Sequence, residues 1–269
     1  MSEPVVTLGA TGTDYGNPMA IPQMRSYSIK SLLAFLFFVF CHIAFRIGLV
    51  DFISLIPFAV FLLKLIRFSL IHYGFSYTGG QVVDKLHIHL LKYLHWDGHG
   101  KLLDVGCGSG RLSIRCAKTF PAAKIVGLDN FDPHFGYGLK QCENNALKEG
   151  VSSQCEFRCD DACKIDFPSE TFDAVVCNLV YHDVHSEPDK KKLLLETLRV
   201  LKKGGVFVIQ DFFNVEHLFG KPEELVQMLK DLGFEEVTYN GHLEGEHFTP
   251  WYVTFHQFDQ WLGVLYGKK

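Results

Sequence analysis

The sequence has no large surplus of charge of either sign and no low-complexity composition. Its 269 residues include 26 Lys and Arg against 30 Asp and Glu, and the net charge is −4. This balance gives the chain no overall basic field, which disfavours a general nucleic-acid-binding function. A hydrophobic share of 48% excludes an intrinsically disordered chain, and 24 Gly with 10 Pro exclude a collagen-like one. The length suits one large α/β domain or two small ones.

The cysteines show no metal-binding or disulfide framework. There are eight in the chain, and none belongs to a CxxC pair. Cys155, Cys159 and Cys163 are spaced by four residues, which is not the ligand spacing of a zinc knuckle. We therefore expect reduced thiols and no bound metal.

Charge is missing altogether from two stretches near the amino terminus, residues 31–45 and 52–63. A membrane-spanning helix needs about 20 apolar residues, so each uncharged run is slightly short by itself. Arg46 and Lys64 at the ends of the runs could extend them by snorkelling. The sequence predicts a membrane segment over residues 31–71. Two spans, a re-entrant or interfacial hairpin, and a pair of buried core helices all remain open.

Basic residues give this segment a preferred orientation. Only Arg46 lies at its turn, whereas Arg25, Lys30, Lys64, Arg67 and Lys85 lie toward its two outer ends. The positive-inside rule then places both ends, and the large domain that follows, in the cytoplasm. Residues 1–26 are rich in Gly, Thr, Pro and Ser without apolar periodicity, and we expect a mobile polar tail.

From about residue 79 to residue 269, short apolar runs alternate with longer amphipathic stretches. This alternation predicts an α/β fold with a mainly parallel sheet covered by helices on both faces. The seven expected strands are 101–106, 125–129, 155–158, 172–178, 205–211, 235–240 and 261–267. The expected helices are 81–94, 110–118, 138–149, 188–201 and 221–232. Ligands of such sheets bind at the carboxyl ends of the strands.

A glycine loop follows the first of these strands and precedes a helix. Gly106, Gly108 and Gly110 alternate there, and Asp104 lies two residues before the first glycine. Glycines let a ligand approach the backbone closely, and the helix start presents N–H groups to it. A dinucleotide fingerprint would have its third glycine where this chain has Arg111. A carboxylate beside the loop suits an ammonium or sulfonium group better than a pyrophosphate.

Asp129 ends the next expected strand, 19 residues after Gly110. A carboxylate at this place can accept hydrogen bonds from both hydroxyls of a ribose. The alternative is an aspartate that caps the following helix.

These motifs resemble those of the class I S-adenosylmethionine (SAM)-dependent methyltransferases, which have a Rossmann-like fold. The similarity covers residues 80–269 and rests on LLDVGCGSG (102–110), GLD (127–129), CDDA (159–162), FDAVVCNLVYHDV (172–184) and LRVLKKGGVFVIQDF (198–212). The resemblance implies SAM as cofactor. It places Asp104 and the loop glycines near the amino acid portion, Asp129 at the ribose, Asp161 with Ala162 at the adenine, and Asn178 under the methionine portion. The full expected cofactor set is Asp104, Gly106, Cys107, Gly108, Gly110, Asp129, Asn130, Asp161, Ala162 and Asn178.

Methyl transfer from a sulfonium depends mainly on alignment and desolvation, so a base is needed only for a protonated acceptor. His182 is the expected base because imidazole titrates near neutrality, and the adjacent Tyr181 is a second catalytic candidate. A packing or SAM-contacting role for His182 remains open. Trp251 is a candidate for the acceptor wall. Three further histidines, expected to be solvated rather than metal-binding, are His242, His247 and His256.

The predicted function is therefore a membrane-anchored SAM-dependent methyltransferase that acts on a lipid or another apolar small molecule. Anchoring raises the effective concentration of an acceptor that resides in the membrane. A protein methyltransferase at the membrane and a non-catalytic SAM-binding membrane protein remain open. Asp104 and Arg111 disfavour a nicotinamide-dependent oxidoreductase. The sequence gives no oligomeric state.

Overall fold

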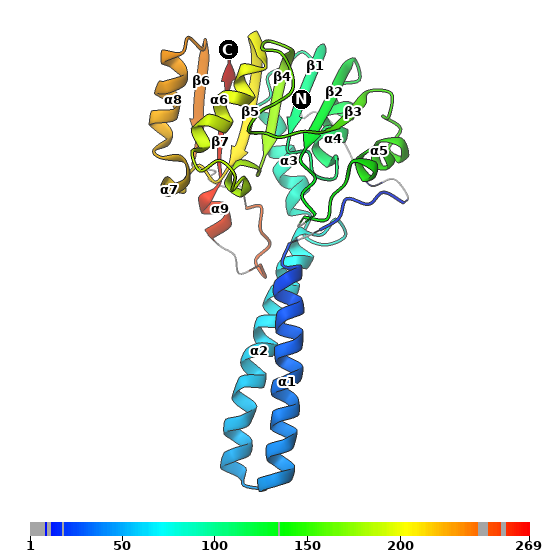
Figure 1. Cartoon of the computed structure of the whole chain (residues 1–269), viewed down its shortest axis with the longest axis vertical. Helices are drawn as coiled ribbons and strands as arrows, with labels where there is room; N and C mark the ends of the chain where they lie inside the picture. The colour runs from blue at the N-terminus through cyan, green and yellow to red at the C-terminus, as the bar shows by residue number, and fades with distance from the viewer. Residues whose placement is uncertain (1–8, 10–11, 18, 134, 242–246, 254–256) are drawn as a thin grey trace. The chain divides into compact units, whose positions relative to one another are not determined.

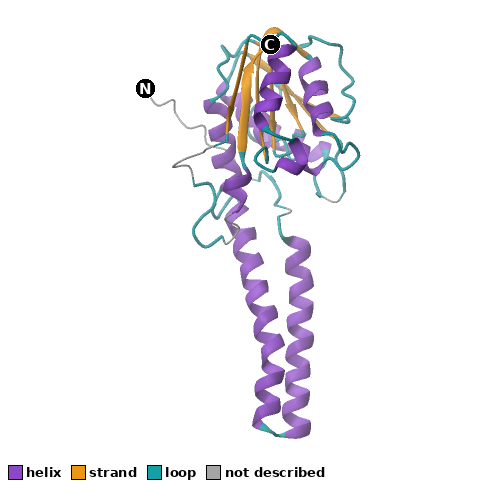
Figure 2. Cartoon of the chain, turned by 90° about the vertical axis from the view of Figure 1, so that its left-hand side faces the viewer, coloured by secondary structure: helices purple, strands orange, loops and turns teal. Residues whose placement is uncertain are grey.

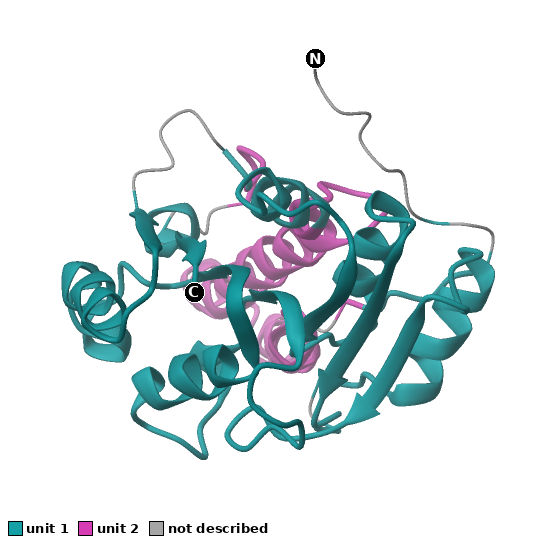
Figure 3. Cartoon of the chain, turned by 90° about the horizontal axis from the view of Figure 1, so that it is seen from above, with its two compact units in different colours: residues 1–16, 84–248, 257–269 teal, residues 17–83, 249–256 magenta. Residues whose placement is uncertain are grey.

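The computed structural model describes residues 9, 12–17, 19–133, 135–241, 247–253 and 257–269. The chain forms two compact units (Figure 3). The sheet unit comprises residues 1–16, 84–248 and 257–269, and the hairpin unit comprises residues 17–83 and 249–256.

A seven-stranded sheet with the order β3-β2-β1-β4-β5-β7-β6 forms the centre of the sheet unit (Figure 1). The strands are β1 Gly100–Val105, β2 Ala123–Asp129, β3 Cys155–Cys159, β4 Phe172–Asn178, β5 Leu201–Asp211, β6 Glu236–Asn240 and β7 Gly263–Lys268. The first five strands are parallel, whereas β7 runs antiparallel to both β5 and β6. The predicted fold class is confirmed. β5 begins four residues earlier than predicted, because Leu201 already pairs with Phe172.

Helices cover both faces of the sheet because successive residues of each strand point to opposite sides. Leu90, Ile114 and Cys142 pack on the face that also receives Leu102 of β1. The opposite face receives Leu103 together with residues of α6 and α8. The helices of this unit are α3 Val82–Lys92, which begins in the hairpin unit, α4 Arg111–Thr119, α5 Leu139–Lys148, α6 Lys190–Arg199, α7 Glu216–Phe219, α8 Pro222–Asp231 and α9 Gln257–Trp261. A short 3₁₀ helix, η1, covers Tyr181–Asp183.

Two long helices, α1 Ile21–Phe45 and α2 Gly48–Phe75, run side by side in the hairpin unit (Figures 1 and 2). Among the described residues, these two helices are long and apolar enough to cross a membrane, with mean hydropathy of 2.0 and 2.3 in their most apolar windows. At 1.5 Å per residue, 25 and 28 residues give lengths of about 37 and 42 Å, against about 30 Å of hydrocarbon. Each helix continues past its uncharged run into the flanking charged residues, so both helices are longer than a membrane span requires.

The outer surface of the hairpin is apolar and its inner surface carries small residues. Leu49 and Phe52 are each 67% exposed, whereas Ser31, Ala34 and Ser54 are buried. Tyr27 stacks on Phe68 at 5.4 Å between the ring centroids. Small residues let two helices approach closely, as is common within membranes. The hairpin helices are thus not core helices of this chain.

The expected tail is partly ordered. α1 already begins at Ile21, with a proline in its first turn, where a missing N–H removes no helical hydrogen bond. Upstream, residues 12–16 lie along α5. Asn145 Nδ2 donates to the Asp14 carbonyl at 2.6 Å, and the buried Tyr15 donates its hydroxyl proton to Glu149 at 2.9 Å. Tyr15 therefore belongs to the core of the sheet unit.

Candidate functional site

A cavity of about 490 Å³ lies at the carboxyl ends of β1, β2, β3 and β4. This is the edge where an open α/β sheet binds its ligand. The lining residues are Gly106, Gly108, Leu128, Asp129, Asn130, Asp132, Phe135, Tyr137, Asp160, Asp161, Ala162, Leu179, Val180, Asp183, Val184, His185 and Ser186. Six residues of the expected cofactor set are among them, whereas Asp104, Cys107, Gly110 and Asn178 are not.

The glycine loop forms one wall of this cavity. Gly106 has a φ of 73°, and a Cβ atom there would overlap the side chain of Val180. The N–H groups of Gly106 and Cys107 both donate to the Leu128 carbonyl, at 2.8 and 2.9 Å. The loop is thereby attached to the end of β2, and only a residue without a side chain fits at position 106.

Asp129, the last residue of β2, binds the glycine loop through its carboxylate. Its Oδ2 accepts from Gly108 N at 2.9 Å, and its Oδ1 accepts from Phe131 N at 2.7 Å. Each carboxylate oxygen has two acceptor positions, so further hydrogen bonds from a diol remain possible in the cavity. The carboxylate is therefore oriented before a ligand arrives.

Asp104 lies beneath the glycine loop rather than in the cavity wall. It is buried, and its Oδ2 accepts from Ser113 Oγ of α4 at 2.5 Å. Burial raises the pKa of Asp104 to about 7, since the interior disfavours the charged form. Its hydrogen bond with Ser113 holds α4 behind the glycine loop.

The two neighbouring acids after β3 differ in how they are used. Asp160 accepts from Asp161 N at 2.8 Å with one oxygen and from Asp166 N at 3.0 Å with the other. Within the described part of the chain, Asp161 uses only Oδ1, which accepts from Cys163 N at 2.8 Å. Asp161 thus keeps more acceptor capacity for a ligand than Asp160 does.

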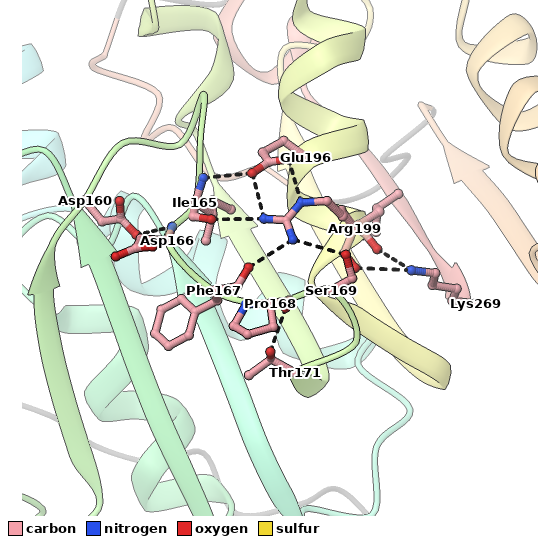
Figure 4. Close-up of polar contacts among 11 residues, drawn as sticks. Asp160, Ile165, Asp166, Phe167, Pro168, Ser169, Thr171, Glu196, Arg199 and Lys269 are labelled. Atoms are coloured by element: carbon pink, nitrogen blue, oxygen red, sulfur yellow. Dashed lines mark hydrogen bonds and ion pairs between the residues drawn. The ribbon is translucent and has the colours of Figure 1, made fainter.

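Arg199 holds the loop that follows these acids (Figure 4). From the end of α6 its guanidinium donates to the carbonyls of Ile165 and Phe167, at 3.0 and 2.9 Å. Glu196 pairs with Arg199 and accepts from Ile165 N at 2.8 Å. The fork of guanidinium donors suits such a multiple contact. This arrangement was not predicted from the sequence, because it joins positions more than 30 residues apart.

Tyr181, a predicted catalytic residue, lies in the core and not among the residues that line the cavity. Its side chain is fully buried, and its hydroxyl donates to Thr197 Oγ1 at 2.7 Å. The short η1 helix turns Tyr181 into the core while its neighbour His182 turns toward Asp211. Tyr181 therefore stabilises the loop and has no contact with the cavity.

His182 lies between two carboxylates, which favour its protonated form over the free base that its predicted role requires. Its Nδ1 lies 2.7 Å from Asp211 Oδ1, and its Nε2 lies 3.4 Å from Asp183 Oδ2. Burial by itself would lower the pKa of His182, but hydrogen bonds and charge from Asp183 and Asp211 outweigh it and raise the pKa to about 10. A protonated imidazole cannot accept another proton.

Asp211 organises this part of the site. It is fully buried and also accepts from Tyr181 N at 2.8 Å and Phe212 N at 2.7 Å. Phe212 packs on the His182 ring at 4.2 Å between centroids and on Trp261 of α9 at 5.6 Å. The sequence did not predict α9, so this aromatic cluster was missed.

Tyr137 is a second missed residue. It lines the cavity, and its ring approaches Gly108 so closely that a Cβ there would lie 3.3 Å from it. Burial raises the pKa of Tyr137 to about 12, so its hydroxyl stays protonated. The aromatic and glycine residues of FGYG (135–138) were the available signal.

The remaining candidates that the structure describes, Trp251 and His247, do not line the cavity. Trp251 is 88% exposed and belongs to the hairpin unit, and His247 is exposed in the sheet unit. His242 and His256 lie outside the described residues. No group of three or more possible metal ligands occurs among the described residues, and all eight cysteines are free thiols.

The charge of the cavity distinguishes between possible cofactors. Five carboxylates line it, and no Lys or Arg is among the lining residues: the acids are Asp129, Asp132, Asp160, Asp161 and Asp183. This environment attracts a sulfonium and repels a pyrophosphate. Asp129 and Asp161, the residues predicted for the ribose and the adenine, both line this cavity. The sheet order, the glycine loop and the acidic cavity define a class I SAM-dependent methyltransferase domain.

Comparison with known proteins agrees with this class. A sequence model of the methyltransferase-domain family matches residues 97–255, which is more than half of the chain. The chain therefore belongs to the methyltransferase-domain family.

The curated relatives share a narrower name. A sterol 24-C-methyltransferase of Gibberella zeae is 32% identical over 174 residues, covering 56% of this chain and 44% of the relative. The cycloartenol-C-24-methyltransferase 1 of Oryza sativa is 31% identical over 175 residues, covering 57% and 48%. The chain spans about half the length of these relatives.

Solved structures show the same fold. The [4+2]-cyclase SpnF matches with a TM-score of 0.52 and 21% identity over 70% of this chain and 82% of that one. A geranyl diphosphate methyltransferase in complex with SAM matches with a TM-score of 0.50 and 14% identity over 72% and 92%. A cyclase and a methyltransferase on one fold show that the reaction must be argued from the site.

Proposed function

We propose that this protein transfers a methyl group from SAM to an apolar lipid acceptor of the sterol class, and that its hairpin anchors it in the membrane that holds this acceptor. The acidic cavity carries the cofactor part of the proposal. The names of the curated relatives and the apolar hairpin support the acceptor class.

SAM supplies an activated methyl group, so the work of the protein is to bind, orient and desolvate the reactants. Asp129 would orient the ribose and Asp161 the adenine. The Asp211 carboxylate accepts hydrogen bonds from the backbone N–H groups of Val180, Tyr181 and Phe212, at 2.7 to 3.2 Å. These bonds shape the end of the site at β4 and β5. His182 keeps its proton. Methyl transfer to an unsaturated carbon would release S-adenosylhomocysteine and leave a carbocation on the acceptor, which must then lose a proton. A carboxylate of the cavity wall, such as Asp183, would accept that proton, since His182 is already protonated.

The hairpin supports the membrane part of the proposal. Its outer surface is apolar over two helices of sufficient length, and its basic residues lie mainly toward the ends that join the sheet unit. By the positive-inside rule, the sheet unit would lie in the cytoplasm.

The test uses the full chain in phosphatidylcholine vesicles that contain total lipid extract, with and without added cycloartenol. Methyl-tritiated SAM is supplied, and label is counted in lipid, protein and aqueous fractions. Asp129→Ala should abolish transfer into lipid. Asp97→Ala, which removes a carboxylate whose side chain is 77% exposed, should leave it unchanged.

The three fractions separate the alternatives. Label in lipid that disappears in Asp129→Ala supports the proposal. Label in protein would replace the lipid acceptor by a protein, and label confined to the aqueous fraction would replace it by a soluble metabolite. SAM binding without label in any fraction would contradict methyl transfer to lipid.

A further inference from the structure

A buried chain of hydrogen bonds leads to Asn178, at the carboxyl end of β4. Asn178 pairs in register with Gln210 of β5, so both side chains lie on the same face of the sheet. Cys177 pairs with Val105 of β1, and Asn178 therefore lies next to the start of the glycine loop. It also directly precedes Leu179 and Val180, which line the cavity.

The Leu86 carbonyl fixes the direction of this chain. The Gln210 side chain is fully buried, and one of its terminal atoms lies 3.3 Å from Leu86 O and 2.8 Å from Asn178 Oδ1. A carbonyl oxygen can only accept, so the Gln210 atom beside it must be the amide nitrogen. The same nitrogen then donates its second hydrogen to Asn178.

The orientation of Asn178 follows from that of Gln210. Because its Oδ1 accepts from Gln210, the Asn178 side chain turns its oxygen away from a ligand and keeps its NH₂ group for other contacts. Within the described part of the chain, no protein group accepts from this NH₂. Asn178 is half-buried rather than enclosed.

His89 of α3 completes the support for Gln210. Its Nδ1 lies 2.7 Å from Gln210 Oε1 and must donate, because that oxygen only accepts. His89 is buried, and its Nε2 lies 3.5 Å from the Tyr93 hydroxyl, which accepts from Asn240 at 3.0 Å. Each member has one role, and together they hold His89 in the Nδ1–H tautomer.

The position of Asn178 in the sheet indicates which part of a ligand it meets. If the ribose lies at the end of β2 and the adenine at the end of β3, as the proposed function has it, the strand order places the rest of the cofactor toward β1 and β4. The hydrogen-bond acceptor of that methionine portion is its carboxylate. An amide NH₂ is a suitable donor to a carboxylate, and a bond to a charged partner is among the stronger ones.

We propose that Asn178 donates a hydrogen bond from its NH₂ group to the carboxylate of the cofactor, and that Gln210 and His89 are positioning residues that fix this orientation. The inference rests on the SAM-binding part of the proposed function and is independent of the acceptor.

The first test measures binding of S-adenosylhomocysteine and of its decarboxylated analogue by calorimetry, on the full chain in detergent micelles. Asn178→Asp keeps an acceptor for Gln210 but presents oxygen in place of NH₂. It should weaken binding of S-adenosylhomocysteine at least about tenfold and change binding of the decarboxylated analogue less than about twofold. Asn144→Asp makes the same change at an exposed position of α5 and should change neither. Equal losses for both ligands, or no loss, would overturn the proposal.

The second test addresses the positioning residues. Gln210→Glu removes the donor to Asn178 and should produce the same selective loss as Asn178→Asp. Nitrogen-15 NMR of the histidine rings in the unmodified chain needs no folded variant, and it should show His89 protonated at Nδ1 and not at Nε2. An Nε2–H tautomer would refute the direction of the chain. Because neither test uses methyl transfer, failure of the lipid-acceptor proposal leaves both outcomes readable.

Discussion

Substitution of His182 by glutamine tests whether the buried Asp211–His182 pair is a permanent ion pair. The pKa of His182 rises from 6.5 in an unfolded chain to about 10 in the folded protein. Burial lowers this pKa, but the hydrogen bonds and charges of Asp183 and Asp211 raise it by more. A difference of about 3.5 units corresponds to at most about 5 kcal/mol of folding free energy. Truncation of one partner of a buried pair destabilises by about 3 to 5 kcal/mol.

The pH dependence has a definite sign. A histidine with a raised folded pKa stabilises the protein fully below pH 6.5, and this contribution is lost as the pH rises toward 10. The unmodified protein should therefore lose unfolding free energy between pH 7 and pH 10. His182→Gln should be about 3 kcal/mol less stable at pH 6, with a flatter pH profile.

Urea unfolding in detergent micelles, followed by tryptophan fluorescence at several pH values, measures both quantities. His185→Gln is the matched control, since this neighbouring histidine is exposed. A variant that keeps the slope of the unmodified protein between pH 7 and pH 10 would refute the ion pair.

Three further predictions concern residues of the sheet unit. Tyr181→Phe should keep methyl transfer and lower the free energy of unfolding by about 1 kcal/mol, since it removes one buried hydrogen bond; urea unfolding and a transfer assay check this, and loss of transfer at unchanged stability would restore a catalytic role. Gly106→Ala should abolish binding of S-adenosylhomocysteine in calorimetry, because a Cβ at positive φ meets Val180; unchanged affinity would show that the loop can move. Tyr15→Ala should lower the unfolding free energy by about 3 kcal/mol through a core cavity, whereas Tyr77→Ala in the hairpin unit should have less effect; equal values for both would contradict a core role for Tyr15.

The sheet was predictable because its signals are local. Each strand is a short apolar run between polar or glycine-rich stretches, and a run such as FDAVVCN needs no partner to be recognised. The glycine loop and Asp129 were predictable for the same reason, since a chemical motif occupies consecutive residues there.

The parts that were missed depend on distant residues. Tyr15 reaches Glu149 across 134 positions, and His89 reaches Gln210 across 121. Adjacent residues can also turn in different directions, as the 3₁₀ geometry does for Tyr181 and His182. Periodicity could not assign either side chain there, because η1 is only three residues long.

The buried contacts of Arg111 show how the hairpin unit is joined to the sheet unit in the sequence. Arg111 pairs with Asp84, and its guanidinium lies over the Tyr15 ring at 5.3 Å from the centroid. Tyr15 and Asp84 therefore both contact the Arg111 side chain, although residues 17–83 lie between them in the sequence. The hairpin is thus an insertion in the sequence of the sheet unit, and amino-terminal truncation to remove it would also remove Tyr15. A short linker from Gly16 to Asp84 would instead excise the insertion and keep both residues beside Arg111.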